Sequence, residues 1–316
     1  ISVTACDKKR FCTIKENFIR TYQRNTEIRN LTGLVNSTSN TQDIWENSGT
    51  CYSVCSYEEG QNYREYEDET LYELLRHVKA LAKVISGYHE KKYLHLDIKP
   101  ENVFIFPETA EHVMLFDFDS VVSEDEIKKK TDFILSYSAG FSAPEQKRGR
   151  NDQIGTWSDV YSIGALLYFK LFGKKADLLD IWIGKGIRIK HTKYDKDINS
   201  PKLERMLKQF FENTLAISRY ARWKTMDDVL NALDQMIPMA DPENKYIPGN
   251  FVYNENCFVG RRKELSAIRD MLVNVNAVFL SGIGGSGKTE IAKRYAYCYR
   301  ESYNVIMFLR FDKSIR

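Results

Sequence analysis

Three polar side chains in one short stretch could together transfer a phosphoryl group. They are Asp97, Lys99 and Asn102, in the run His-Leu-Asp-Ile-Lys-Pro-Glu-Asn at 95–102. The carboxylate can accept a hydroxyl proton, the ammonium can neutralise the moving group, and the amide oxygen can bind Mg²⁺. These groups meet at one point only if the backbone forms a tight, irregular loop. The stretch therefore predicts a loop that handles phosphate.

A second carboxylate for the metal follows a predicted hairpin. The strand-like segments 103–106 and 112–116 flank a turn, and Asp117-Phe118-Asp119 comes directly after the second segment. Asp117 can therefore share a cation with Asn102. Before the loop, 70–89 has the apolar spacing of a long amphipathic helix that delivers the chain to it.

The order and spacing of four motifs resemble the eukaryotic-type protein kinases. The run at 95–102 is similar to their His-Arg-Asp catalytic loop, with Leu96 in place of arginine. Residues 117–119 resemble Asp-Phe-Gly, with Asp119 in place of glycine. Residues 143–145 are Ala-Pro-Glu, and 156–173 resembles the buried helix that braces the catalytic loop. The resemblance covers residues 1–237 and implies a Ser/Thr protein kinase that uses ATP and Mg²⁺ on protein substrates.

The resemblance also assigns roles. Asp97 and Lys99 would be catalytic, and Asn102 and Asp117 would hold the metal. ATP would be positioned by Lys15, in a strand-like segment at 11–15, and by Glu27 of the following helix at 18–34, which would pair with it. Other expected contacts are those of His95 with Phe118, of Ser138 with Asp97 and Lys99, of Arg222 with Glu145, and of Asp159 either with loop amides or only with its own helix as a cap.

Two departures from the kinase pattern leave an alternative open. Leu96 removes the arginine that would bind an activating phosphate, so an active enzyme would not depend on phosphorylation by that route. Asp119 replaces a glycine with a flexible backbone, although aspartate tolerates left-handed angles better than most residues. The alternative is a pseudokinase, a regulatory or interaction module attached to a signalling NTPase.

A different pattern follows a Pro- and Gly-containing linker at 238–257. A helix to about Val273 and a buried strand at 277–281 precede Gly-Ile-Gly-Gly-Ser-Gly-Lys-Thr, and a helix at 290–299 follows it. This is the context of a P-loop, in which glycine amides approach phosphates, Lys288 reaches the β- and γ-oxygens and Thr289 binds Mg²⁺. The predicted nucleotide-binding residues are Gly282, Gly284, Gly285, Ser286, Gly287, Lys288 and Thr289.

With the preceding Val-Gly-Arg at 259–261, residues 258–316 resemble the start of the NB-ARC/STAND signalling ATPases. The resemblance implies a second nucleotide site and self-association through this module. The chain begins at Ile1 without methionine and stops inside this segment. We therefore expect a fragment of a multidomain signalling protein, whose kinase domain lacks its first strand and glycine-rich loop.

The expected fold class is α+β: a bilobal kinase-like fold with a β-rich N-lobe and a helical C-lobe, then a truncated α/β P-loop segment. The net charge is +3, and no apolar run approaches the ~20 residues of a membrane span, so we expect a cytoplasmic protein without a membrane partner. The basic excess after Gly260 permits a third interpretation, nucleic-acid binding, which predicts salt-dependent affinity for DNA. A solvated or phosphate-binding surface accounts for the excess without it.

Overall fold

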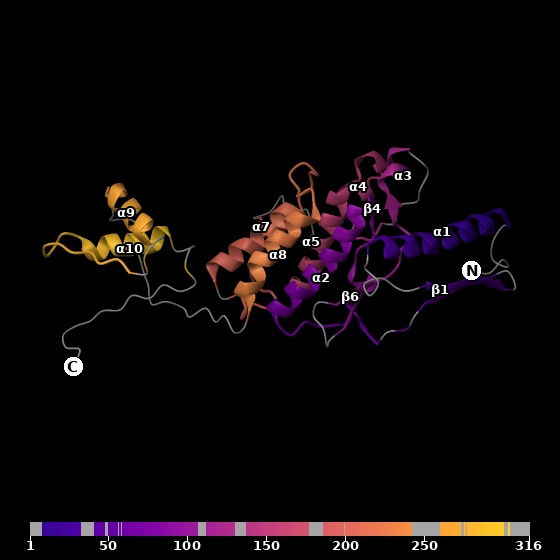
Figure 1. The fold of residues 1–316 in the computed structure, drawn as a ribbon, viewed down its shortest axis with the longest axis horizontal. Coiled ribbons are helices and arrows are strands. Elements are labelled where there is room, and N and C mark those ends of the chain that lie inside the picture. The colour runs from indigo at the N-terminus through magenta and orange to yellow at the C-terminus, as the bar shows by residue number, and fades with distance from the viewer. Residues whose placement is uncertain are drawn as a thin grey trace. The chain divides into compact units, whose positions relative to one another are not determined.

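The computed structural model divides the chain into two compact units, Ile1–Asn244 and Lys245–Arg316, which are described separately (Figure 1). The structure describes residues 8–32, 41–47, 50–55, 57, 59–106, 112–129, 137–176, 186–198, 200–241, 260–272, 275, 277–299 and 303. None of the described helices is long and apolar enough to cross a membrane.

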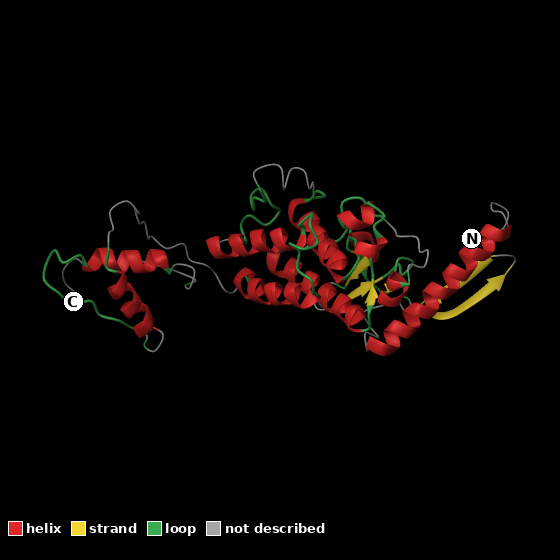
Figure 2. Ribbon diagram, turned by 90° about the horizontal axis from the view of Figure 1, so that it is seen from above, coloured by secondary structure: helices red, strands yellow, loops and turns green. Residues whose placement is uncertain are grey.

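The first unit opens with a long helix and a two-stranded hairpin. Helix α1 (Lys8–Thr32) contacts β1 (Thr41–Asn47), which pairs antiparallel with β2 (Thr50–Cys55). In Figure 2 the hairpin strands run alongside this helix. Trp45 and Tyr52 stack across the strand pair, with ring centroids 5.7 Å apart.

The predicted strand at 11–15 is wrong, because this segment belongs to α1. Its apolar residues Phe11, Ile14, Phe18 and Tyr22 recur every three or four positions, which is the spacing of a helix. No glycine or proline interrupts the sequence of α1, so the helix predicted from Phe18 extends ten residues further toward the N-terminus.

Four long helices pack together in the first unit, after the hairpin (Figure 1). They are α2 (Leu71–Glu90), α5 (Thr156–Phe172), α7 (Pro201–Thr214) and α8 (Met226–Ala240). Helix α2 packs against α5 and α8, and α5 packs against α7. Helix α5 is buried on nearly every side, as its apolar sequence predicts. The helices predicted at 70–89 and 156–173 are confirmed as α2 and α5.

Short paired strands flank both ends of the stretch at 95–102. The strands are β3 (Gln61–Asn62), β4 (Tyr93–Leu94), β5 (Val103–Ile105), β6 (Val113–Leu115) and β7 (Val122–Ser123). Strand β4 enters the stretch and pairs with β7, whereas β5 leaves it and pairs with β3 and β6. Val103 lies opposite Leu115 in this register, so the predicted hairpin is confirmed. Two short helices, α3 (Glu124–Lys128) and α4 (Pro144–Lys147), follow.

The second unit contains two described helices, α9 (Arg262–Leu272) and α10 (Lys288–Cys298), as predicted. They bury Leu265, Ile268 and Ile291 between them. The predicted buried strand at 277–281 is wrong, since these residues form no strand and Phe279 is 93% exposed. A strand is buried only by neighbouring strands and covering helices, and the described part of this unit holds no strand with which 277–281 could pair. The expected strand at 304–311 lies outside the described residues.

The junction between the units differs slightly from the prediction. Helix α8 continues through Pro238 to Ala240, three residues into the expected linker. The rest of that linker, 242–257, lies outside the described residues.

Gly164 permits the close approach of α5 and α7. A β-carbon at Gly164 would lie 2.2 Å from Thr214 Oγ1, and this hydroxyl is fixed by its hydrogen bond to the Phe210 carbonyl (2.9 Å). We expect Gly164→Ala to lower the free energy of unfolding by about 2 kcal/mol, because overpacking forces buried groups apart. Urea unfolding should show this loss, whereas Lys208→Ala on the exposed side of α7 should change stability by less than about 0.5 kcal/mol. A Gly164→Ala protein as stable as the wild type would contradict the packing.

Candidate active site

Two side chains converge on the carboxylate of Asp97, which is 4% exposed. Lys99 Nζ donates to Asp97 Oδ2 at 2.6 Å. Asn102 Nδ2 donates to the same oxygen at 3.2 Å and to the Asp97 carbonyl at 2.9 Å. The 3₁₀ turn Pro100–Asn102 carries the amide back to the aspartate. The structure therefore brings the three predicted residues together.

A serine hydroxyl lies at the other oxygen of this carboxylate. Ser138 Oγ donates to Asp97 Oδ1 at 2.7 Å and accepts from Lys99 Nζ at 3.3 Å. Ser142 Oγ accepts from Ser138 N at 2.8 Å and fixes its backbone. The expected contacts of Ser138 are confirmed. A hydroxyl in this position lies where the carboxylate can accept its proton and where the ammonium can neutralise negative charge that develops next to it.

The residue before Asp97 is held in an unfavourable conformation. Leu96 has a φ of 62°, a left-handed angle that costs a residue with a β-carbon roughly 1–2 kcal/mol. Asp159 accepts hydrogen bonds from the amides of Leu96 (2.8 Å) and His95 (3.0 Å). Gln146 Nε2 donates to the Leu96 carbonyl at 2.7 Å. Side chains of α4 and α5 thus fix the backbone that presents Asp97.

Asp159 is fully buried in the first turn of α5. Burial alone raises the pKa of a carboxyl group, but the bonds from His89 Nε2 (2.8 Å) and from the His95 amide outweigh it, so the pKa of Asp159 lies below its usual value. The carboxylate is therefore ionised at neutral pH. The interpretation as a plain helix cap is wrong, because the N-cap of α5 is Gly155.

His95 is a buried scaffold residue, as expected. Its ring packs edge-on against Phe118, with centroids 6.1 Å apart, and its Nδ1 accepts from the Asp97 amide at 3.4 Å. Burial lowers the pKa of His95, although the charges of Asp159 and Asp97 oppose the shift. The neutral ring thus packs between the stretch at 95–102, to which it belongs, and the segment that follows β6.

The β5–β6 pairing brings the two predicted metal ligands to the same end of the sheet. Phe116 N donates to the Asn102 carbonyl at 2.8 Å, directly before Asp117. The amide nitrogen of Asn102 is engaged by Asp97, which leaves its oxygen for a cation. The Asp117 side chain is exposed. A carboxylate and an amide oxygen are ligands that Mg²⁺ takes, so these residues fit the ion.

Asp119 does not need the backbone freedom of glycine. The left-handed angle falls on Asp117 (φ 62°), and Asp119 is not among the residues with positive φ. Burial and the neighbouring charge of Asp117 raise the pKa of Asp119, and a hydrogen bond from Thr21 of α1 opposes this. The strain expected from the missing glycine is therefore not present at this position.

The structure separates Lys15 from Glu27. Both lie on α1, and their separation of twelve residues corresponds to about 18 Å along a helix. Lys15 pairs with Glu46 of β1, and Glu27 accepts a hydrogen bond from the hydroxyl of Tyr93. Burial and the charge of Glu27 raise the pKa of this Tyr93 hydroxyl. The predicted Lys15–Glu27 pair is wrong, because the strand expected to carry Lys15 is helical.

A buried ion pair fixes α4. Arg222 NH1 donates to Glu145 Oε1 at 2.8 Å, as predicted, and Ser158 Oγ donates to the same oxygen at 2.8 Å. Glu145 precedes Gln146, so this pair also positions the amide that holds Leu96. The sequence did not predict the roles of Gln146 and His89. Neither residue belongs to a motif that marks a functional position, and only the packing of the helices brings both residues to the stretch at 95–102.

The residues predicted to form a P-loop make a compact turn before α10. Lys288 Nζ donates to the carbonyls of Gly282 (2.8 Å) and Ile283 (2.9 Å). Gly287 has a φ of 79° and is the N-cap of α10, so the first amides of the helix are directed toward the turn. Arg261 NH2 donates to the Ser286 carbonyl at 2.8 Å. Unpaired amides at a helix start attract phosphate.

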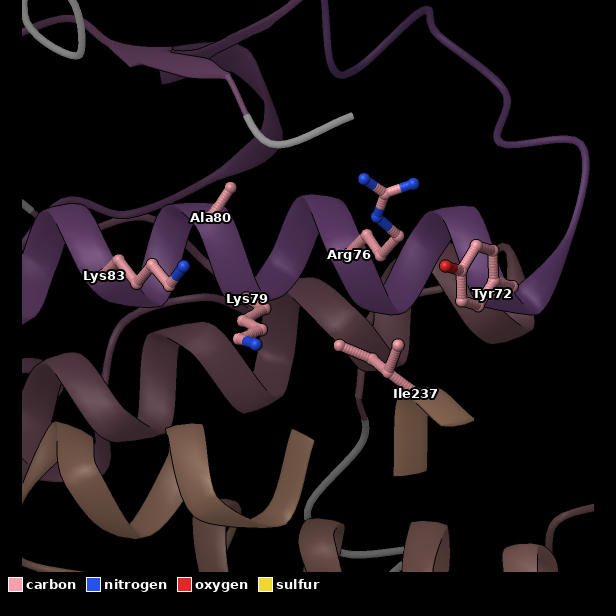
Figure 3. A pocket seen from close by; sticks show the side chains of 6 residues that line it. All are labelled: Tyr72, Arg76, Lys79, Ala80, Lys83 and Ile237. Carbon is pink, nitrogen blue, oxygen red and sulfur yellow. The ribbon is translucent and has the colours of Figure 1, made fainter. Parts of the chain in front are cut away.

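A basic groove lies between α2 and α8 (Figure 3). Its lining residues are Tyr72, Arg76, Lys79, Ala80, Lys83 and Ile237. Lys79 is paired there with Asp234. None of the residues around Asp97 lines this groove.

Known proteins show similarity over most of the first unit. A family profile described as "Protein kinase domain" matches residues 10–233. The serine/threonine-protein kinase AtPK1/AtPK6 of Arabidopsis thaliana is 36% identical over 95 residues, 30% of this chain and 19% of that protein. PknB of Mycobacterium leprae is 28% identical over 127 residues, 39% of this chain and 20% of that protein. The chain thus spans about a fifth of the length of these relatives.

A solved structure shows the same fold. The "Twitchin kinase region from C.elegans (Fn31-NL-kin-CRD-Ig26)" superposes with a TM-score of 0.52 at 19% identity, over 82% of this chain and 43% of that chain.

We expect Asp159→Asn to lower the free energy of unfolding by about 3 kcal/mol at pH 7, because it removes one member of a buried charged cluster. Folding lowers the pKa of Asp159. The contribution of its carboxylate to the free energy of unfolding is therefore complete above the pKa of an unfolded aspartate, about 4, and declines as the pH falls toward the lower pKa of the folded protein. Urea unfolding of both proteins from pH 7 to pH 3 should show their difference shrinking below about pH 4. Asp152→Asn, at an exposed position, serves as the control. A difference that grows toward low pH would contradict the assignment.

Proposed function

The chain belongs to the protein kinase domain family, and from this premise we propose that it transfers the γ-phosphoryl group of ATP to serine or threonine hydroxyls of a protein substrate. The observation that carries the proposal is the group of Asp97, Lys99 and the Ser138 hydroxyl, with contacts of 2.6, 2.7 and 3.3 Å. It supplies a proton acceptor and a cation at a place where a serine hydroxyl fits. The relatives named serine/threonine-protein kinases support the same acceptor class.

Each residue has a separate role in the proposed reaction. Asp97 orients the acceptor hydroxyl and accepts its proton, while Lys99 neutralises charge on the moving group. Asn102 and Asp117 would hold Mg²⁺, which neutralises the charge of the phosphates when bound. The left-handed conformation of Leu96 and its hydrogen bond to the buried Asp159 keep the carboxylate of Asp97 in place before the substrate binds.

A second candidate is a pseudokinase, a regulatory or interaction module. The separation of Lys15 from Glu27 on one helix favours it, since the sequence-assigned ATP contact is lost. The intact group around Asp97 favours catalysis, because a module without chemistry has no need of a buried carboxylate between an ammonium and a hydroxyl.

We also propose a second nucleotide site in residues 258–316, as part of a STAND-type P-loop module in a multidomain signalling protein. The turn capped by Gly287 and the position of Lys288 over it support this proposal. A STAND module would also give the protein a surface for self-association.

Replacement of the proton acceptor tests the reaction. We expect Asp97→Asn to lower phosphoryl transfer from radiolabelled ATP and Mg²⁺ to a serine-containing test protein by at least ~100-fold, because general bases contribute about that much. Asp125→Asn, whose side chain is 74% exposed, should transfer at the wild-type rate. Transfer that persists in folded Asp97→Asn would reject the assignment, and no transfer by the wild type would favour the pseudokinase.

Replacement of the P-loop lysine tests the second site. We expect Lys288→Ala to remove one of two binding steps in a titration of the chain with a fluorescent ADP analogue, because the β-phosphate loses its cation. Lys293→Ala, one turn further along α10, should retain both steps. Two unchanged steps in Lys288→Ala would contradict a P-loop site.

A further inference from the structure

One face of α1 is joined by polar contacts to the segment after Asp117. Thr21 is hydrogen-bonded to Asp119, Arg24 NH1 donates to the Val121 carbonyl, and Glu27 is bonded to the hydroxyl of Tyr93 in β4. Residues three and four apart share a face of a helix, so positions 20, 21, 24 and 27 lie on one face of α1. This face covers the segment that leaves the candidate metal site.

Glu126 is at the centre of these contacts and uses its two oxygens differently. Oε2 accepts from the amide (2.9 Å) and hydroxyl (3.1 Å) of Ser123 and so completes the capping box that starts α3. Oε1 accepts from Arg24 NH2 at 2.7 Å and from Arg20. The side chains of Glu126 and Arg24 are 19% and 15% exposed, whereas Arg20 is largely exposed and contributes less.

The same carboxylate is coupled to the catalytic stretch through β7. Ser123 lies opposite Tyr93, and Val122 lies opposite Leu94. Leu94, Leu96, Val122 and Ile154 form a small buried apolar cluster. Leu96 is thus part of an apolar contact, at the position where kinases keep an arginine for an activating phosphate. The charged contact of this segment is made instead from α1.

We propose that Glu126 is a built-in anchor that holds α1 on segment 117–126, and so keeps Asp117 and Phe118 in place without phosphorylation of the chain. A capping box alone needs only Oε2 and Ser123. It does not account for two arginines, about a hundred residues earlier in the sequence, on the other oxygen. The effect on catalysis rests on the proposed function, but the effect on the contact itself does not.

Two substitutions separate the anchor from the cap. Glu126→Gln keeps a side chain that serves in capping boxes but loses the charge that pairs with Arg24. Ser123→Ala removes the hydroxyl of the cap but leaves the carboxylate. Glu124→Gln is the matched control, because Glu124 lies on the same helix and its carboxylate pairs with Lys128.

Hydrogen exchange of the nucleotide-free chain measures the contact directly. Glu126→Gln should raise exchange rates about tenfold in α1 and in residues 117–129. Ser123→Ala should raise them only in residues 122–129, and Glu124→Gln should change neither region. Arg24→Gln should raise exchange in the same regions at least as much, because it also loses the bond to the Val121 carbonyl. The double variant Arg24→Gln with Glu126→Gln should match Arg24→Gln, because the two charges act as one unit. Unchanged exchange in α1, or additive effects of the two substitutions, would overturn the proposal.

Activity measures its consequence. Wild-type protein treated with phosphatase should keep its rate of phosphoryl transfer, and Glu126→Gln should lose about tenfold in kcat with little change in KM for the protein substrate. A phosphatase-treated wild type that loses its activity, or full kcat in Glu126→Gln, would reject the anchor. An inactive wild type with the expected exchange pattern would reject the proposed function and leave the anchor in place.

Discussion

The buried carboxylate of Asp159 is the interaction on which the candidate site depends. It lies in the interior with no solvent exposure, where an ionised group is costly unless its hydrogen bonds are made. His89 and the amides of His95 and Leu96 make them. In return, the backbone at Leu96 is held in a conformation that it would not adopt alone. The geometry around Asp97 is therefore built before any substrate is bound.

Other buried charges in the first unit are satisfied in the same way. Glu145 and Arg222 position α4, and thereby the amide that holds Leu96. Asp68, Glu73 and His77 bring possible ligand atoms within 4.8 Å of one another, but Lys170 Nζ already lies 3.4 Å from Asp68. That ammonium supplies the positive charge which a metal ion would otherwise bring. Such pairs specify an arrangement more than they add stability.

The sequence predicted the helices whose apolar residues recur at regular spacing, and the part of the site that lies in one loop. Helices α2 and α5 follow from their apolar residues, and Asp97, Lys99 and Asn102 from their separation in the chain. The assignment of Lys15 to a strand failed because the same apolar positions also fit a helix, and the choice followed the motif. Contacts such as those of His89, Gln146 and Arg24 depend on the packing of elements far apart in sequence, which leaves no local pattern to read.

The most direct measurement is a crystal structure of the chain with Mg²⁺ and a non-hydrolysable ATP analogue. If the loop is preformed, Leu96 will keep its left-handed φ, Asp159 will keep both backbone amides, and Asn102 and Asp117 will ligate the same ion. A loop that rearranges on binding, or an ion held without Asn102 and Asp117, would contradict the account.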